Sequence, residues 1–467
     1  MARAGAGFKA VLRRRALLAG AAALAASPAA AAPERFPEGF LWGVAASAPQ
    51  TEGAAGRGLS IWDVFAARPG AIRDGSNPSV GTGFETFYPE DLDLTAGAGL
   101  RAFRFSIAWP RVQPQGAGAM NEPGLALYDR IVDAMLARGI RPFATLFHWD
   151  LPAALRGGWL DRDTAYRLAD YAAIVGRRLG DRVRDFMVLN EPGVVAILGH
   201  ALGRHAPGLA SRTAWAAAMH HQNLAQGLGA AALRSVLPAG ARIGAALSLQ
   251  PCRPAAPGAE EAARIWDDAW NRAYLDPLFG RPYPARFAAD LAPLLRAEDM
   301  RRIAARPDFL GVNYYSRMHM VPAPGSVLGA TWGAAPPGTP MTALDWPVEP
   351  DGLLEQLRDL RDAYGNPEVF ITENGAAYTD PPAQGGVIAD PDRIGFLRAH
   401  LGQAARACAE GCRLRGYFTW TLTDNFEWAE GFVPKFGLVA VDRRTLRRTP
   451  KQSLAWLGGC ARGNVVT

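Results

Sequence analysis

Two glutamates stand at the ends of short apolar stretches of this chain. Glu191 ends the stretch DFMVLNE at residues 185–191, and Glu373 is the penultimate residue of EVFITEN at residues 368–374. A single glutamate at a strand end is more often solvated or ion-paired than catalytic. Glycoside hydrolysis requires two carboxyl groups in different environments, since one protonates the leaving oxygen and the other, ionised, attacks the anomeric carbon. The pair therefore indicates glycosidase chemistry if the fold brings both glutamates together.

Polar and aromatic residues also end other apolar stretches of the sequence. Amide and imidazole groups can hydrogen-bond sugar hydroxyls, and aromatic rings offer a flat apolar surface to a sugar face. The residues at these positions are Gln50, Arg104, His148, Asn190, Asn313, Tyr314, Tyr315, Asn374 and Trp420. Each alone could be a satisfied core residue, but together with the two glutamates they favour a binding site.

The elements that must position these residues are eight predicted strands. Most are continuous apolar runs, as expected of parallel strands that are covered on both faces. They lie at residues 40–47, 102–109, 141–147, 185–191, 242–249, 308–315, 368–374 and 415–422.

Helical patterns separate these strands. Tyr128, Ile131, Val132 and Met135 form a stripe that stops before Gly139, and a second stripe runs from Leu168 to Leu179. Further helices are predicted at about residues 212–236, 259–276, 351–364 and 391–409. The Pro/Gly-rich segment 321–347 is predicted to be a long loop over the barrel mouth.

Eight alternating strand–helix units predict an α/β fold, a single (β/α)8 TIM barrel with elaborated βα loops. An open doubly wound sheet is the alternative. Such a sheet would be expected to carry a G-x-G-x-x-G pattern after the first strand, where none occurs. In a barrel the active site lies at the carboxyl ends of the strands. Closure would bring Glu191 and Glu373, on the fourth and seventh strands, to one cavity.

Seven motifs in order along the chain carry a family resemblance. They are FPEGFLWGVAASAPQTEG, FRFSIAWPRVQP, LFHWDLP, VLNEP, GVNYYS, ITENG and TWTLTDNFEW, the last followed by KFGLVAVD. From about Phe36 to Leu457 the chain resembles glycoside hydrolase family 1, the β-glucosidase family.

The resemblance implies a role for each matching residue. Glu191 resembles the general acid/base and Glu373 the nucleophile of a retaining mechanism. Arg104 and Tyr315 resemble the groups that bond the nucleophile, and the positive charge of Arg104 would keep Glu373 ionised. Asn190 resembles the donor to the sugar 2-OH. The remaining substrate-binding residues implied are Gln50, His148, Asn313, Trp420, Glu427 and Trp428.

The implied activity is that of a retaining exo-β-glycosidase, first of all a β-glucosidase acting on terminal non-reducing β-D-glucosyl residues. Small-molecule β-glucosides or cello-oligosaccharides are the expected substrates, and the Glu427 carboxylate favours a neutral glycone over a phosphorylated one. A transglycosylating β-glycosidase and a non-catalytic periplasmic sugar-binding barrel remain as alternatives.

Among the chain's departures from the family pattern, two concern the surroundings of the site. Gly193 stands where the family usually has Trp, which predicts a wider leaving-group side. Residues 83–88 also differ from the usual stretch, and this difference predicts an altered loop before the second helix. Neither departure involves the catalytic pair.

The first 32 residues predict an export signal. They hold five basic residues and no acidic one, then an Ala/Leu-rich run too short to span a membrane and a small-residue end. Arg14 and Arg15 resemble a twin-arginine signal. We therefore expect a signal peptide at 1–32, the barrel domain at 33–467, and a periplasmic or extracellular protein without stable membrane association after signal removal.

Composition excludes several other classes. With 49% hydrophobic residues and 4 Cys in 467 residues, the chain is neither disordered nor a disulfide scaffold. Outside the first 32 residues, 45 basic residues face 44 acidic ones, and the chain shows no basic stripe for nucleic acid. Neither the Cys nor the seven His show metal-ligand spacing, so no metal or cofactor is expected. The sequence does not indicate an oligomeric state.

Overall fold

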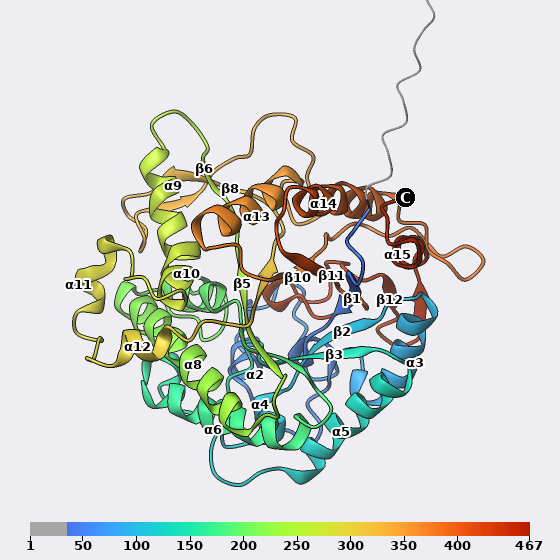
Figure 1. Ribbon diagram of the computed structural model, residues 1–467, viewed down its shortest axis with the longest axis horizontal. Coiled ribbons are helices and arrows are strands. Elements are labelled where there is room, and N and C mark those ends of the chain that lie inside the picture. Colours follow the sequence, from blue (N-terminus) through green and yellow to red (C-terminus); the bar gives the residue numbers. More distant parts are fainter. Residues whose placement is uncertain (1–34) are drawn as a thin grey trace, which may run out of the picture. The chain divides into compact units, whose positions relative to one another are not determined.

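Eight parallel strands form a closed barrel in the spatial order β1-β11-β10-β7-β5-β4-β3-β2 (Figure 1). The computed structural model describes residues 35–467, so the expected signal at residues 1–32 lies outside the described residues. Each strand overlaps one of the eight predicted stretches. The bounds are β1 (Leu41–Ala45), β2 (Ala102–Ser106), β3 (Arg141–Phe147), β4 (Asp185–Asn190), β5 (Arg242–Ser248), β7 (Phe309–Asn313), β10 (Val369–Asn374) and β11 (Leu414–Trp420). The predicted (β/α)8 barrel is confirmed, and the open doubly wound sheet is wrong.

The first and last barrel strands close the sheet. Leu41 pairs with Gly416 and Ala45 with Trp420, in parallel register. Aromatic rings fill the interior below the site, where the ring centres of Phe143 and Phe418 lie 4.9 Å apart. A Cβ on Gly43 would lie 2.7 Å from the Phe418 ring, so this glycine leaves room for the ring. The filled interior gives the strand ends a rigid base.

Long helices surround the barrel (Figure 1). They are α3 (Phe84–Gly97), α5 (Glu122–Ala137), α6 (Asp163–Leu179), α8 (Arg212–Val236), α13 (Asp351–Ala363), α14 (Pro391–Ala409) and α15 (Gln452–Gly463). Helices α8 and α14 have the predicted bounds. Helix α5 ends before Gly139, whose φ of 66° is the left-handed conformation expected of a residue after a helix end.

Two of the long helices, α3 and α15, lie where no helix was predicted. Residues 84–88, expected to alter a loop, form the start of α3 instead, and α15 follows the last strand motif. Pro89 lies inside α3, and a proline within a stretch normally argues against a helix because it lacks an N–H donor. As the sixth residue of α3, this proline cannot donate to the backbone oxygen of Glu85, four residues before it, so the helix forms despite the proline.

The predicted helix at residues 259–276 is interrupted. It consists of α9 (Glu260–Asp267), a π-helical turn η3 (Asp268–Arg272) and α10 (Ala273–Leu278). The side chain of Asn271 donates to the backbone oxygen of Gln250 at 2.9 Å and to Asp267 at 2.7 Å, which anchors the wide turn to the loop after β5. Wide turns of this kind recur at functional sites.

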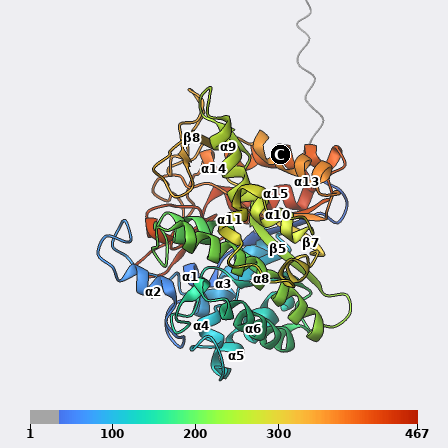
Figure 2. The same ribbon diagram turned by 90° about the vertical axis from the view of Figure 1, so that its left-hand side faces the viewer.

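The segment 321–347 is only partly a loop. It contains the end of β8 (Met318–Pro322) and β9 (Ala330–Trp332), which form a three-stranded sheet with β6 (Cys252–Pro254). Strand β8 lies beside helix α9 (Figure 2). Residues 331–336, Met341 and residues 344–347 contribute to a cavity at the barrel mouth, so the predicted place of this segment is confirmed.

The remaining elements are short. They are α1 (Ala48–Thr51), α2 (Ile61–Ala66), α4 (Trp109–Val112), η1 (Gly158–Leu160), α7 (Pro192–Val194), η2 (Val195–Ala201), η4 (Ala285–Phe287), α11 (Ala288–Leu291), α12 (Asp299–Ile303), η5 (Trp428–Glu430), β12 (Val439–Val441) and β13 (Arg448–Pro450). In the part of the chain from residue 35 onward, no helix is long and apolar enough to cross a membrane. Within the same residues, no three His, Cys, Asp or Glu side chains form a group that could hold a metal ion.

Candidate active site

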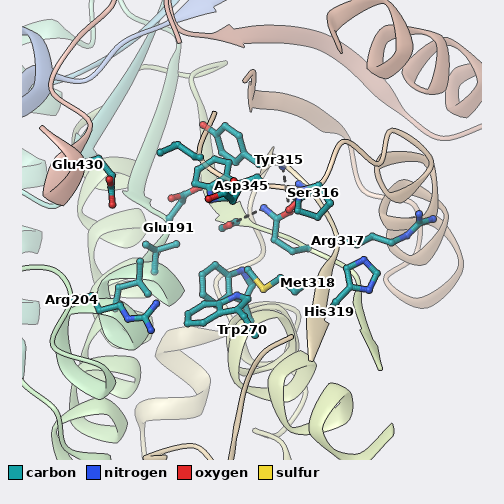
Figure 3. Close-up of a pocket in the computed structure, with 18 of the residues that line it drawn as sticks. Glu191, Arg204, Trp270, Tyr315, Ser316, Arg317, Met318, His319, Asp345 and Glu430 are labelled. Carbon is teal, nitrogen blue, oxygen red and sulfur yellow. Dashed lines mark hydrogen bonds between the residues drawn. The ribbon is translucent and has the colours of Figure 1, made fainter. Parts of the chain in front are cut away.

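A cavity of about 860 Å³ opens at the carboxyl ends of the barrel strands. Side chains from several strand ends face it, including Glu191 and Tyr315 (Figure 3). Among the residues predicted from the sequence, those that line the cavity are His148, Glu191, Tyr315, Glu373, Trp420, Glu427 and Trp428. The other four, Gln50, Arg104, Asn190 and Asn313, are buried behind the lining and hydrogen-bond to it.

Glu373, on β10, is held by two donors. Its Oε1 forms an ion pair with Arg104, and its Oε2 accepts a hydrogen bond of 2.6 Å from the Tyr315 hydroxyl. A cation and a hydroxyl donor on one carboxylate stabilise its negative charge and fix its orientation. Glu373 is therefore oriented as an ionised nucleophile would need to be.

Arg104 is itself fixed by the neighbouring strands. Its Nε donates to Thr145 Oγ1 on β3 at 3.2 Å, and its Nη1 donates to the backbone oxygen of Thr372 on β10 at 3.3 Å. Its Nη2 donates to Asn190 Oδ1 on β4. These contacts place the charge of Arg104 across the barrel interior, next to Glu373.

Glu191 occupies a different environment from Glu373. Burial, and then the nearby negative charge of Glu373, raise the pKa of Glu191 well above its ordinary value. The Oε1 atom accepts a 2.8 Å hydrogen bond from Asn313. Glu191 therefore keeps its proton under conditions in which an exposed glutamate is ionised, as a general acid must.

The backbone at Glu191 is unusual. Its φ and ψ of 47° and 57° are left-handed, and Pro192 begins helix α7 directly afterwards. Trp149 and Trp428, which also line the cavity, have positive φ as well. Non-glycine residues adopt this conformation at a cost, and such residues cluster at functional sites.

A network of amides lies beneath the two carboxyl groups. Asn190 Oδ1 accepts from both Arg104 and Asn313, so its Nδ2 must face His148 Nε2, 3.0 Å away. His148 Nε2 is then an acceptor, and the imidazole is neutral with its proton on Nδ1. Burial, together with the charge of Arg104, lowers the pKa of His148 well below its ordinary value, in agreement with this arrangement.

Gln50 and Glu427 form a polar end of the site. Gln50 Nε2 donates to the backbone oxygen of Phe426 at 2.9 Å and lies 3.4 Å from Glu427 Oε2. Burial, and then the charge of Glu373, raise the pKa of Glu427 to about 8. A protonated Glu427 can donate as well as accept a hydrogen bond, which suits a sugar hydroxyl.

Aromatic rings surround this polar end. The His148 ring stacks near Trp420, with centres 5.9 Å apart and an interplanar angle of 16°. The centre of the Trp428 ring lies 4.4 Å from the centre of the Trp149 ring. The site thus combines two unlike carboxyl groups, hydrogen-bonding amides and flat apolar surfaces.

The sequence matches the family described as Glycosyl hydrolase family 1 over residues 32–465. The chain belongs to this family. Beta-glucosidase A of Thermotoga maritima is 40% identical over 446 residues, which cover 92% of this chain and 98% of that protein. A beta-glucosidase of Agrobacterium sp. is 42% identical and covers 92% of this chain and 96% of its own length.

Solved structures of glycosyl hydrolase family 1 enzymes share the fold in detail. The psychrophilic beta-glucosidase of Micrococcus antarcticus has a TM-score of 0.88 and 41% identity, covering 92% of this chain and 98% of that one. The Thermotoga maritima beta-glucosidase in complex with glucoimidazole has a TM-score of 0.87 and 38% identity, covering 92% and 99%.

Several cavity residues of this family 1 chain were not predicted from the sequence. Trp149 follows His148 in the motif LFHWDLP and could have been found there. Trp332 and Trp346 lie in the segment predicted to cover the mouth, where tryptophans are a signal of ligand contact. Arg204 and Trp270 gave no such signal. Further unpredicted lining residues include Val194, Leu198, His205 and Met318.

Proposed function

We propose that this chain is a retaining exo-β-glycosidase, first of all a β-glucosidase that hydrolyses terminal non-reducing β-D-glucosyl residues. The single observation that carries the proposal is the contrast between two carboxyl groups in one cavity. Glu373 is held by Arg104 and Tyr315, whereas burial and the charge of Glu373 raise the pKa of Glu191 well above its ordinary value. The relatives named beta-glucosidase at about 40% identity support the same activity.

In the first step, an oxygen of Glu373 attacks the anomeric carbon. The bond from that carbon to the leaving oxygen breaks, and the proton of Glu191 passes to the leaving oxygen. The product is a covalent glycosyl ester on Glu373 and a released alcohol. Tyr315 and Arg104 orient the attacking carboxylate during this step.

The second step reverses the role of Glu191. Esterification removes the negative charge of Glu373, which is one of the causes that raise the pKa of Glu191. The pKa of Glu191 therefore falls in the intermediate, and the ionised carboxylate can accept a proton from water. The water oxygen attacks the anomeric carbon, and Glu373 leaves as a carboxylate.

The proposed substrates are neutral β-glucosides or cello-oligosaccharides. Gln50 and Glu427 supply hydrogen bonds for hydroxyls at the polar end of the site, and Asn190 is the proposed donor to the 2-OH. The proposed reaction uses the side chains named above and water.

We also propose export to the periplasm or beyond, which rests on the signal-like residues 1–32.

Azide rescue tests the assignment of the nucleophile. The protein should hydrolyse 4-nitrophenyl β-D-glucoside, Glu373→Ala should lose this activity, and azide should restore turnover with α-glucosyl azide as product. The variant Glu191→Ala should instead give β-glucosyl azide, because its nucleophile is intact. Absence of turnover by the parent on β-glucosides, β-galactosides and β-fucosides would overturn the proposal. Product analysis with added alcohol separates hydrolysis from transglycosylation.

A further inference from the structure

The outer part of the cavity has an apolar wall that the proposed reaction does not use. It consists of Val194 from α7, Leu198 from η2, Trp270 from η3, and Met318 and Trp332 from β8 and β9. Helices α7 and η2 directly follow Glu191. Because the general acid must face the leaving oxygen, the side chains that follow it line the side on which the leaving group lies. We call this wall the outer wall.

Tryptophans make the outer wall flat and rigid. Trp270 stacks on buried Trp266 at 6.3 Å with an interplanar angle of 16°, and Trp332 meets Trp266 edge-on at 4.7 Å. Gly193 allows this arrangement, since a Cβ there would lie 3.1 Å from the Tyr274 ring and 3.3 Å from the Trp270 backbone oxygen. Such a surface suits a flat ring.

Arg204 adds a positive charge beside the outer wall. Its guanidinium carbon lies 5.1 Å from the centre of the Trp332 ring, and its side chain is exposed. In residues 35–467, no carboxylate forms an ion pair with it. Arg317, the other arginine of the cavity, is instead paired with Glu349 and Glu355. Arg204 is thus the cavity arginine whose charge is available to a ligand.

The other titratable groups at the mouth do not neutralise Arg204. Burial lowers the pKa of the adjacent His205 to about 3, so this imidazole is uncharged. Glu430 is paired with Arg73. Asp345 lies on the Tyr315 side of the cavity, whereas Arg204 lies on the Trp270 side (Figure 3).

We propose that the leaving-group side of this cavity prefers an aryl aglycone that carries a carboxylate, as in the glucoside of a phenolic acid. The aromatic ring lies against Trp270, and Arg204, held over the Trp332 ring, pairs with the carboxylate. Arg204 is then a specificity-determining residue. This inference rests on the proposed function and names its substrate class.

A matched pair of substrates tests the preference. The glucosides of 4-hydroxybenzoate and 4-hydroxybenzamide differ in charge but hardly in size. We expect Arg204→Gln to lower the ratio of kcat/KM for the carboxylate over the amide by about fivefold, the value of one exposed ion pair. Arg204→Lys should keep part of the ratio. In the parent, added salt should lower the ratio as well.

Arg68→Gln is the control variant. Arg68 also lies over an aromatic ring, 5.3 Å from the centre of Phe65, but it does not line the cavity. This variant should leave the ratio unchanged. An equal ratio in the parent and in Arg204→Gln would overturn the inference.

Binding of a non-hydrolysed analogue separates the two proposals. The dissociation constant of the 1-thio-β-D-glucoside of 4-mercaptobenzoate should rise about fivefold in Arg204→Gln, whatever the turnover. Failure to hydrolyse 4-nitrophenyl β-D-glucoside with this shift present would count against the proposed function alone. Normal hydrolysis with no shift would overturn the carboxylate preference alone.

Discussion

At the scale of single residues, the proposed role of Glu191 as general acid predicts an alkaline limit of activity. Because the proposed acid acts in its protonated form, we expect kcat/KM to fall as pH rises through the pKa of Glu191, which burial and the charge of Glu373 raise. Glu191→Gln should remove this alkaline limb and lower kcat/KM on cellobiose by about 10²–10⁴. The loss should be much smaller on 2,4-dinitrophenyl β-D-glucoside, whose leaving group needs no proton. Rates measured from pH 5 to 10 check this.

If the fall of kcat/KM at alkaline pH persists in Glu191→Gln, another group protonates the leaving oxygen. Glu427, whose pKa is about 8, would be the next candidate, because it lies in the same cavity.

The hydroxyl of Tyr315 is a second test at this scale. Tyr315→Phe removes the 2.6 Å hydrogen bond to Glu373 and should lower kcat/KM by about 10- to 100-fold, the range for a hydrogen bond to a charged group. Tyr314→Phe is the matched control. Its hydroxyl donates to the backbone oxygen of Glu349, so this variant should lose stability and keep its kcat/KM. Equal kinetics of the two variants would contradict the role of Tyr315.

At the scale of elements, the barrel strands were predictable for a physical reason. Both faces of each strand are buried, so a stretch such as residues 185–190 is apolar apart from its ends. A polar residue at the end of such a strand faces the carboxyl end of the barrel. This places Glu191, directly after β4, and Glu373, near the end of β10, in the cavity from the sequence alone. Their individual roles came from the family resemblance.

The elements that shape the outer part of the cavity were less predictable. The wide turn at residues 268–272 shifts the helical period, and a pattern based on 3.6 residues per turn cannot indicate which side chain faces the cavity. Trp270 was missed for this reason. Strands β8 and β9 have only five and three residues, too few for a clear alternation, so residues 321–347 were predicted as a loop.

Gly193, in α7, faces η3 and α10 and provides the next prediction. Gly193→Ala places a methyl group 3.1 Å from Tyr274 and 3.3 Å from the Trp270 backbone oxygen, so η3 or α10 must shift. We expect it to lower the free energy of unfolding by about 1 kcal/mol, as overpacking does. It should also move the outer wall and lower kcat/KM for aryl glucosides more than for alkyl glucosides.

Gly395→Ala is the control for Gly193→Ala. Gly395 lies inside α14, and a Cβ there meets no atom within 4 Å. This variant should raise the free energy of unfolding by about 0.5–1 kcal/mol, because alanine loses less entropy than glycine on helix formation. Urea denaturation of both variants checks the opposite signs. A stabilised Gly193→Ala would show that the helices tolerate the methyl group.

At the scale of the whole molecule, buried charged groups join distant parts of the chain. Lys451, before α15, is fully buried and pairs with Asp380 at 2.6 Å and Asp424 at 2.9 Å. These carboxylates lie in the segments that follow β10 and β11. The pairs tie the last helix to the carboxyl ends of two barrel strands. Buried pairs of this kind are costly to break singly, since one uncompensated charge remains.

Asp150 is a buried carboxyl group that lacks such a partner. Its Oδ1 accepts a hydrogen bond of 3.4 Å from the backbone N–H of His148, and among residues 35–467 nothing hydrogen-bonds to its Oδ2. Burial raises the pKa of Asp150 to about 7. Between the unfolded pKa of about 3.9 and this value, the folded chain holds a proton that the unfolded chain has lost. The contribution of Asp150 to stability is therefore present at pH 4 and is lost as pH rises to 7.

Asp150→Asn isolates this effect, because the amide has nearly the same shape and does not titrate. The Tm of the variant minus the Tm of the parent should increase from pH 4.5 to about pH 7, because only the parent loses the contribution of Asp150 in this range. It should then stay constant to pH 8.5, since Asp150 is ionised in both states there. Asp170→Asn, at an exposed position on α6, is the control and should give a difference that hardly changes with pH. A Tm difference for Asp150→Asn that is equally flat would mean that Asp150 is ionised in the folded protein, with Arg57 as the nearby cation that stabilises it.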